Sequence, residues 1–184
     1  MLFRRPPHPI EAEIPRLRRF ALALTRDRET ADDLVQDCVA RALAAWATRR
    51  GDDDALRPWL FTILHNRWRT RQQREWARPD RVSLDAAGEG PEISGGQWEA
   101  LELRDLDAAL AKLSEEQRAV LLLVGVEGLS YEEAARVQNV PIGTVMSRLA
   151  RARDRLRRLT DGEPPHKNDG QWGEGGRPHL RRVK

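Results

Sequence analysis

The sequence lacks several features that are typical of redox, metal-dependent and membrane proteins. A single cysteine, Cys38, cannot form an internal disulfide, and together with four scattered histidines it offers no zinc-binding set. No apolar run approaches the length of a membrane span, and residues 1–14 lack the apolar core of a signal peptide. There is no glycine-rich phosphate loop and no pair of catalytic carboxylates with a supporting base. We therefore expect a cytoplasmic protein that is not an enzyme, with no metal, no cofactor and no small-molecule substrate.

Charge, by contrast, is abundant and nearly balanced. Charged residues make up 33% of the 184 residues, yet the net charge is only +3. Affinity for nucleic acid would therefore have to come from local clusters of arginine rather than from the overall charge. The length suits one domain or two small ones, each with a core of its own.

The stretch from residue 129 to 159 carries the clearest pattern. Ser130 followed three residues later by Glu133 is a capping box, which starts a short helix. Asn139 tolerates the left-handed backbone that ends such a helix, and Pro141 suits the first turn of the next one. Two helices joined by so short a turn indicate a helix-turn-helix that docks on DNA.

The second helix of this motif has an apolar stripe and a basic face. Apolar residues recur at alternating spacings of three and four from Ile142 to Leu159, so they are expected to pack against the rest of the domain. The other face is free to enter the major groove. A solvated basic helix is the alternative, which the capped partner helix and the tight turn disfavour. The residues predicted to read DNA are Gly143, Thr144, Ser147, Arg148, Arg151 and Arg155.

Three helices are predicted in the first half of the chain. Residues 1–9 are expected to form a flexible lead-in, and an apolar stripe then marks a helix over residues 10–24. Thr30 is the expected N-cap of a second helix. In that helix Cys38 is interpreted as a small core residue rather than a redox centre. The expected buried face consists of Leu34, Val35, Cys38, Val39, Ala42, Leu43 and Trp46.

Two surfaces of these helices have the composition of binding surfaces. The outward side of the second helix is polar and acidic from Asp32 to Arg41, which fits a solvated face or a docking surface for another protein. A third helix, expected from Pro58 to about Ala77, interleaves arginines with aromatic residues. Surfaces that bind single-stranded nucleic acid have this composition, because guanidinium groups hold phosphates while rings stack on bases. For Trp59 and Trp68, however, core packing explains the pattern equally well.

The second half of the chain is expected to be a separate domain. Residues 78–96 are rich in glycine, proline and acidic residues without a sustained period, and we interpret them as a flexible linker. A helical pattern resumes near Gln97, and a second capping box, Ser114 with Gln117, opens a helix that stops within residues 125–128. The tail after residue 160 is expected to be disordered, and a weak electrostatic role for it stays open. The fold class predicted is therefore all-α, with small helical domains at residues 10–77 and 97–160.

Three motifs resemble conserved regions of the bacterial extracytoplasmic-function (ECF) sigma factors, in the order and spacing of that family. Region two is matched by RRFALALTRDRETADDLVQDCVARALAAW and LRPWLFTILHNRW, and region four by LDAALAKLSEEQRAVLLLVGVEGLSYEEAARVQNVPIGTVMSRLARARDRL. The resemblance implies a three-helix bundle and a helix-turn-helix in a protein that binds core RNA polymerase and directs promoter-specific transcription. FALALT, LRPWLFTIL and LVGVEGLSYEEAA are most similar to the general-stress subfamily, whose members an anti-sigma factor holds inactive until a phosphorylated sigma mimic releases them.

The resemblance also implies roles for individual residues. Region four would read the minus-thirty-five element and contact the polymerase flap, while residues 78–96 would run towards the active centre and the RNA exit path. One base of the minus-ten element would flip out of the stack. The clamp helices of the largest polymerase subunit would be gripped by Asp32, Asp33, Leu34, Gln36 and Asp37. The non-template strand of the minus-ten element would be bound by Arg49, Arg50, Asp52, Arg57, Trp59, His65, Asn66 and Arg69.

Two alternatives from other classes stay open. A sigma-like decoy would bind only an anti-sigma factor, but it would have no need of the basic face at Arg148, Arg151 and Arg155. A stand-alone helix-turn-helix regulator would leave the acidic helix and the arginine–aromatic helix without a role, and no ligand-sensing domain is evident. The sigma-factor interpretation gives each of these surfaces a partner.

Overall fold

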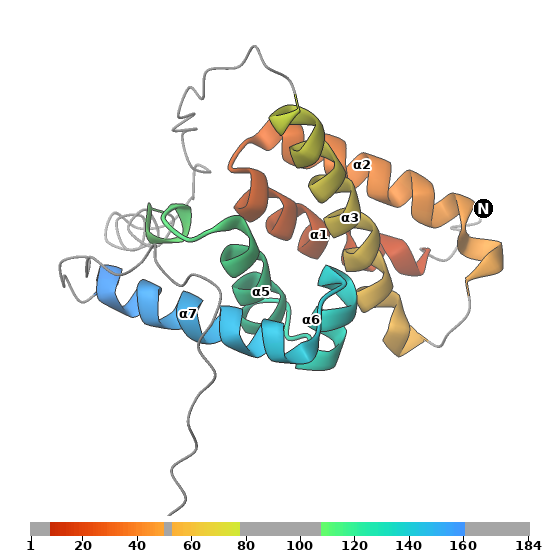
Figure 1. The fold of residues 1–184 in the computed structure, drawn as a ribbon. Coiled ribbons are helices and arrows are strands. Elements are labelled where there is room, and N and C mark those ends of the chain that lie inside the picture. Colours follow the sequence, from red (N-terminus) through yellow and green to blue (C-terminus); the bar gives the residue numbers. More distant parts are fainter. Residues whose placement is uncertain (1–7, 50–52, 78–107, 161–184) are drawn as a thin grey trace, which may run out of the picture.

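The computed structural model describes residues 8–49, 53–77 and 108–160, which form two packed groups of helices (Figure 1). The first group is a three-helix bundle of α1 (Pro9–Thr25), α2 (Arg28–Ala44) and α3 (Leu56–Trp76), with 3-10 turns at Trp46–Thr48 and Asp53–Ala55. The second contains α5 (Glu115–Gly125), α6 (Tyr131–Gln138) and α7 (Ile142–Thr160). We refer to them as the bundle and the helix-turn-helix unit. The predicted all-α fold is confirmed.

Several sequence predictions fall on residues that the structure does not describe. The linker at residues 78–96 and the beginning of the helix expected near Gln97 lie outside the described residues, as does the tail from residue 161. A helical turn at residues 108–111 and the buried Leu113 are described. Within the described ranges, no helix combines the length and apolar character that a membrane span requires.

The core of the bundle forms where the apolar stripes of its three helices meet. Phe20 and Phe61 are fully buried, and their rings meet edge to face with centroids 5.0 Å apart. Cys38 is also buried, and its Sγ donates a hydrogen bond to the Leu60 carbonyl oxygen at 3.5 Å. Burial raises the pKa of the Cys38 thiol to about 12. Cys38 is therefore an unreactive core residue, as predicted.

The second helix differs from its prediction at its cap and on its buried face. Asp27, not Thr30, is the N-cap, because the Asp27 carboxylate accepts a hydrogen bond from the Thr30 backbone nitrogen at 2.8 Å. The hydrogen bonds from Thr30 lower the pKa of Asp27. Leu43 was assigned to the buried face but is 50% exposed, because the contact with α1 and α3 covers a narrower stripe than the apolar pattern suggested.

The first and third helices both begin earlier than predicted. Pro9 is already in α1, since the Nδ1 of His8 accepts a hydrogen bond from the backbone nitrogen of the residue after Pro9 and so caps the helix. Pro58 stands inside the first turn of α3, which begins at Leu56, where a proline needs no backbone donor. Pro9, Leu56 and Arg57 are therefore helical, although the sequence pattern placed them before these helices.

Both predicted capping boxes are present in the helix-turn-helix unit. Ser114 and Gln117 cap α5 reciprocally, and Ser130 and Glu133 do the same for α6. Asn139 has a φ of 53° and ends α6 in the left-handed conformation, as predicted. These local devices fix the turn between α6 and α7.

The apolar stripe of α7 packs against α5 and α6 along most of its length. Val145, Leu149 and Ala152 are buried, as predicted. Ile142, which was assigned to the same stripe, is 40% exposed, because the buried part of the stripe begins only at Val145. The opposite face of α7 is left open to solvent (Figure 1).

The bundle and the helix-turn-helix unit pack directly against each other. α3 lies against α6, and α1 lies against α5 (Figure 1). Buried apolar residues of both belong to one continuous cluster. The sequence predicted two domains on a linker and gave no indication of this contact.

Candidate nucleic-acid and polymerase interfaces

The open face of α7 presents half of the residues predicted to read DNA. Gly143, Ser147 and Arg151 are exposed and follow one another at intervals of four, so they lie on one side of the helix. Thr144 and Arg155 are half-buried beside them, and the Ser147 Oγ donates a hydrogen bond to the Thr144 carbonyl oxygen at 3.0 Å. A helix with this exposed face, and with a basic residue at its middle, can enter a major groove.

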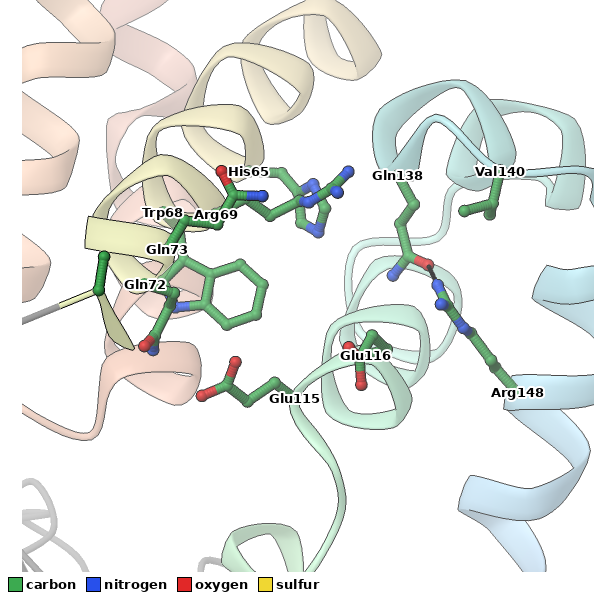
Figure 2. A pocket seen from close by; sticks show the side chains of 11 residues that line it. His65, Trp68, Arg69, Gln72, Gln73, Glu115, Glu116, Gln138, Val140 and Arg148 are labelled. Atoms are coloured by element: carbon green, nitrogen blue, oxygen red, sulfur yellow. Dashed lines mark hydrogen bonds between the residues drawn. The ribbon is translucent and has the colours of Figure 1, made fainter. Parts of the chain in front are cut away.

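Arg148 is held by the protein itself. Its Nη1 donates a hydrogen bond to the Oε1 of Gln138 at 3.0 Å, and Gln138, the last residue of α6, is only 2% exposed. Figure 2 shows the Arg148 side chain reaching from α7 to Gln138, beside the cavity that lies against α3. In this conformation Arg148 is directed away from the open face where we expected it.

A cavity of about 580 Å³ lies between α3 and the helix-turn-helix unit (Figure 2). His65 lines it and is 4% exposed, because α6 packs over this side of α3. Burial lowers the pKa of His65 to about 4, and the positive charges of Arg69 and Arg148 act in the same direction, so its imidazole is neutral at neutral pH. In this conformation no strand can reach His65, so its predicted contact with the minus-ten strand stays a prediction for another arrangement of the two units.

An arginine–aromatic cluster stands where α2 ends. The guanidinium carbon of Arg49 lies 5.3 Å from the ring centroid of Trp46 and 5.7 Å from that of Trp59. The two indole rings are 6.5 Å apart. These are cation–π distances, which hold the half-buried Arg49 beside two rings. Trp59 is half-buried here, whereas Trp68 is a core residue.

The remaining residues predicted to bind the minus-ten element do not form one surface. Asn66 lines an open hollow of about 640 Å³ together with Trp59, next to the arginine–aromatic cluster. Arg69 is exposed but lines the cavity between the bundle and the helix-turn-helix unit. Arg57 donates from Nε to the Glu13 carboxylate of α1 at 3.1 Å, so its charge joins α3 to α1. Outside the described residues lie Arg50 and Asp52.

The acidic side of α2 is neutralised in part by arginines of neighbouring helices. Asp32 accepts a hydrogen bond from Arg18 of α1 at 2.8 Å. Asp37 forms ion pairs with Arg41 of its own helix at 3.0 Å and with Arg67 of α3. Because these pairs are largely solvent-exposed, they contribute little to stability and leave the carboxylates accessible to a partner.

A groove of about 460 Å³ runs between this side of α2 and α3. Asp33 lines it and is exposed, and Gln36 is exposed nearby. Leu34 also lines the groove but is only 5% exposed, so most of its side chain packs in the core. The basic wall of this groove consists of arginines that the sequence indicated only as part of the arginine–aromatic surface of the third helix. That wall consists of Arg67, Arg71 and Arg74.

Comparison with known families gives a match to each half of the chain. Residues 10–65 match the model described as the Sigma2 domain of PhyR, and residues 103–156 match Sigma-70, region 4. The chain is 40% identical over 153 residues to the ECF RNA polymerase sigma factor EcfG of Rhodopseudomonas palustris, covering 82% of each protein. It is 37% identical over 156 residues to the ECF RNA polymerase sigma factor SigC of Mycobacterium tuberculosis, covering 79% of this chain and 77% of SigC.

Solved structures share the arrangement of helices. The sigma factor RpoE of Bartonella quintana, solved in complex with the anti-sigma factor NepR, matches with a TM-score of 0.70 and 36% identity over 84% of this chain and 96% of that one. The PhyR–NepR complex of Sphingomonas sp. Fr1 matches with a TM-score of 0.62 and 20% identity over 95% of this chain and 97% of that one. The second likeness concerns the fold alone.

Proposed function

Because the chain belongs to the ECF RNA polymerase sigma factors, we propose that it binds core RNA polymerase and directs transcription from promoters with minus-ten and minus-thirty-five elements. The bundle engages the polymerase and the minus-ten element, and the helix-turn-helix unit reads the minus-thirty-five element. In this role the chain selects the promoter at which the polymerase starts transcription and catalyses no reaction itself.

The observation that carries this proposal is the open face of α7. Ser147 and Arg151 are exposed before and at the middle of a helix that a capped partner helix and the left-handed Asn139 hold in place. Such preorganisation lets side chains reach base edges without first ordering the backbone. One well-placed arginine–guanine contact provides about 1–3 kcal/mol of discrimination between bases.

The minus-ten element is assigned to the end of α2 and the beginning of α3. The arginine–aromatic cluster supplies a cation and two half-buried rings, and the adjacent hollow offers Asn66 as a donor and acceptor for a base. Separated strands favour such a site, because an unpaired base needs little further energy to leave the stack.

The polymerase is assigned to the acidic side of α2. Asp33 and Gln36 are exposed there, and Asp32 and Asp37 make only exposed ion pairs within the chain. Charged groups of this kind steer a basic partner surface into register more than they add affinity.

An anti-sigma factor is the expected regulator. The Bartonella RpoE structure, which shares 36% identity with this chain, contains the anti-sigma factor NepR. A partner of that kind, together with the similarity to EcfG, supports a role in a stress response.

A sigma-like decoy is the second candidate. The match of residues 10–65 to the Sigma2 domain of PhyR favours it, since PhyR of Bartonella is described as an anti-anti-sigma factor. A decoy binds the anti-sigma factor without needing DNA or polymerase. The exposed Arg151 and the open acidic side of α2 argue for the sigma factor instead.

Transcription from a library of promoter fragments tests the proposal. The purified chain is added to core RNA polymerase, and the transcripts are sequenced to locate their start sites. A sigma factor yields starts at a fixed distance from two shared sequence elements. Binding of an anti-sigma factor without any transcripts would assign the decoy role.

A further inference from the structure

We propose that the free chain holds itself closed through a latch between α1 and the loop after α5, and that this latch must open before the chain can bind a promoter. The latch consists of Glu127 and Arg118 on the helix-turn-helix unit, and Arg16, Arg19 and the Leu24 carbonyl on α1. The inference rests on the proposed function, because it concerns how that function is regulated.

The centre of the latch is a buried carboxylate whose partner charges lie across the contact. The Glu127 side chain is 1% exposed. Its Oε1 accepts hydrogen bonds from the Nη2 and Nε of Arg19 at 2.9 and 3.2 Å, and the Nη1 of Arg16 lies 3.7 Å from its Oε2. A buried carboxylate is tolerated only when charge and hydrogen bonds compensate its lost hydration. Loss of the α1 arginines while the contact stays closed would therefore leave a buried carboxylate without compensating charge.

A second contact fastens the carboxyl end of α1. Arg118 of α5 is 8% exposed, and its Nη1 donates a hydrogen bond to the Leu24 carbonyl oxygen at 3.2 Å. The last carbonyls of a helix have no partner within that helix, and a cation there also complements the helix dipole. From α5, on the other side of the contact, Arg118 provides both the hydrogen-bond donor and the positive charge.

The closed arrangement is incompatible with simultaneous binding of both promoter elements. Their names place them roughly 25 base pairs apart, which corresponds to about 85 Å of B-form DNA. Here α3 lies against α6, with His65 buried and Arg148 tied to Gln138 in the contact. Residues 78–96, the predicted linker, can span roughly 60 Å when extended, and the two helical units add their own length, so the chain can open far enough without unfolding its helices.

Distance measurements on the free full-length chain test the latch. Spin labels are attached through Ala40→Cys on α2 and Ala150→Cys on α7, both at exposed positions. Cys38 stays unlabelled because it is buried and the pKa of its thiol is about 12. With the latch residues unchanged, the distance between the two spin labels should show one short, narrow distribution. Arg19→Glu, which places two carboxylates together, should shift most of the population to longer, broader distances.

Three further variants separate the latch from a general disturbance. Arg19→Ala leaves Glu127 poorly compensated and should open the chain partially, with α1 still helical by circular dichroism. Arg18→Glu is the matched control, because Arg18 pairs with Asp32 inside the bundle, and it should keep the short distance. Glu127→Gln added to Arg19→Glu removes the repulsion and should restore part of the short population.

Promoter binding supplies the functional readout. Because only open chains bind the promoter, the apparent affinity is reduced in proportion to the fraction of chains that are open. Arg19→Glu raises that fraction and should therefore lower the chain concentration needed for half-maximal transcription by about 5- to 10-fold. Unchanged distances in Arg19→Glu, or a wild-type chain that is already extended, would overturn the latch even if the chain transcribes. Opening without tighter promoter binding would show that the contact is not inhibitory. Opening without transcripts under any condition would count against the sigma-factor function and leave the latch standing.

Discussion

Arg148 and Arg151 stand one helical turn apart on α7 but have different surroundings. Arg151 is exposed on the open face, whereas Arg148 donates a hydrogen bond to the buried Gln138. Their spacing in the sequence makes them look equivalent. Only the position of α6 distinguishes a side chain that is ready to meet DNA from one that must first be released.

Replacing Arg151 tests the assigned reading face. Arg151→Ala should weaken binding to the minus-thirty-five element by about tenfold or more, because one direct base contact contributes about 1–3 kcal/mol. Arg153→Ala is the control, since Arg153 is exposed on α7 but points away from the face of Arg151. Equilibrium binding to duplexes with wild-type and scrambled elements measures both. A loss of equal size on every sequence would mean that Arg151 contacts only phosphates.

His65 makes the stability of the chain sensitive to acid. Its pKa is about 4 in the folded chain against an ordinary value of 6.5, so the unfolded chain takes up the proton first. Stability is therefore lost as the pH falls below about 6.5, and the loss is complete below about 4. At about 1.4 kcal/mol per pH unit, the window from 6.5 to about 4 gives roughly 3.5 kcal/mol as an upper bound. Arg69 and Arg148 oppose the protonated form, and Glu116 on α5 favours it.

His65→Gln removes this proton uptake while keeping a polar side chain in the cavity. Urea unfolding at a series of pH values should then show a flatter decline of the free energy of unfolding between pH 6.5 and 4 than in the unmodified chain. Identical pH profiles for the two proteins would contradict the assignment of this acid sensitivity to His65.

At the scale of the helices, local signals predicted most of what is observed. Both capping boxes and the left-handed Asn139 were read correctly, because each depends on residues three or four positions apart. The cap of α2 was misplaced because Asp27 and Thr30 are both good N-caps, and the sequence does not say which side chain accepts the bond. Leu43 was misplaced because the apolar pattern does not give the width of the contact.

A substitution on the acidic side of α2 tests whether this helix docks on the polymerase. Asp33→Ala should weaken association with core polymerase, because Asp33 is exposed and lines the groove beside α3. The weakening should be several-fold and should diminish at high salt, where exposed charges are screened. Glu29→Ala is the matched control, being an exposed acidic residue of α2 outside the groove. Equal effects of the two substitutions would indicate general electrostatics rather than a docking surface.

At the scale of the whole molecule, the contact between the bundle and the helix-turn-helix unit could not be predicted from the sequence. Glu127 reads as an ordinary surface charge in a glycine-containing turn, and Arg19 as part of a solvated helix face. Their meeting depends on residues more than a hundred positions apart, which no local period encodes. The minus-ten set was predicted as one surface for the same reason, although α6 covers His65 and leaves Asn66 open.

The contacts described above indicate one sequence of events for the chain. The free chain is closed, with the buried Glu127 carboxylate fastening α1 to the helix-turn-helix unit. Opening exposes the faces of α3 and α7 that lie in or beside the contact in the closed chain. The bound promoter then keeps the bundle and the helix-turn-helix unit apart. A regulator that binds the closed form more tightly than the open one would keep the chain inactive, and one that prefers the open form would activate it.

Association of the chain with core RNA polymerase is the most direct test of the central claim. Fluorescence anisotropy of the labelled full-length chain, titrated with core polymerase, measures it, and the Arg19→Glu variant ensures that the latch does not conceal binding. We predict a saturable one-to-one complex that Asp33→Ala weakens and Glu29→Ala does not. If neither the unmodified chain nor the opened variant binds core polymerase at any concentration tested, the chain does not act as a sigma factor.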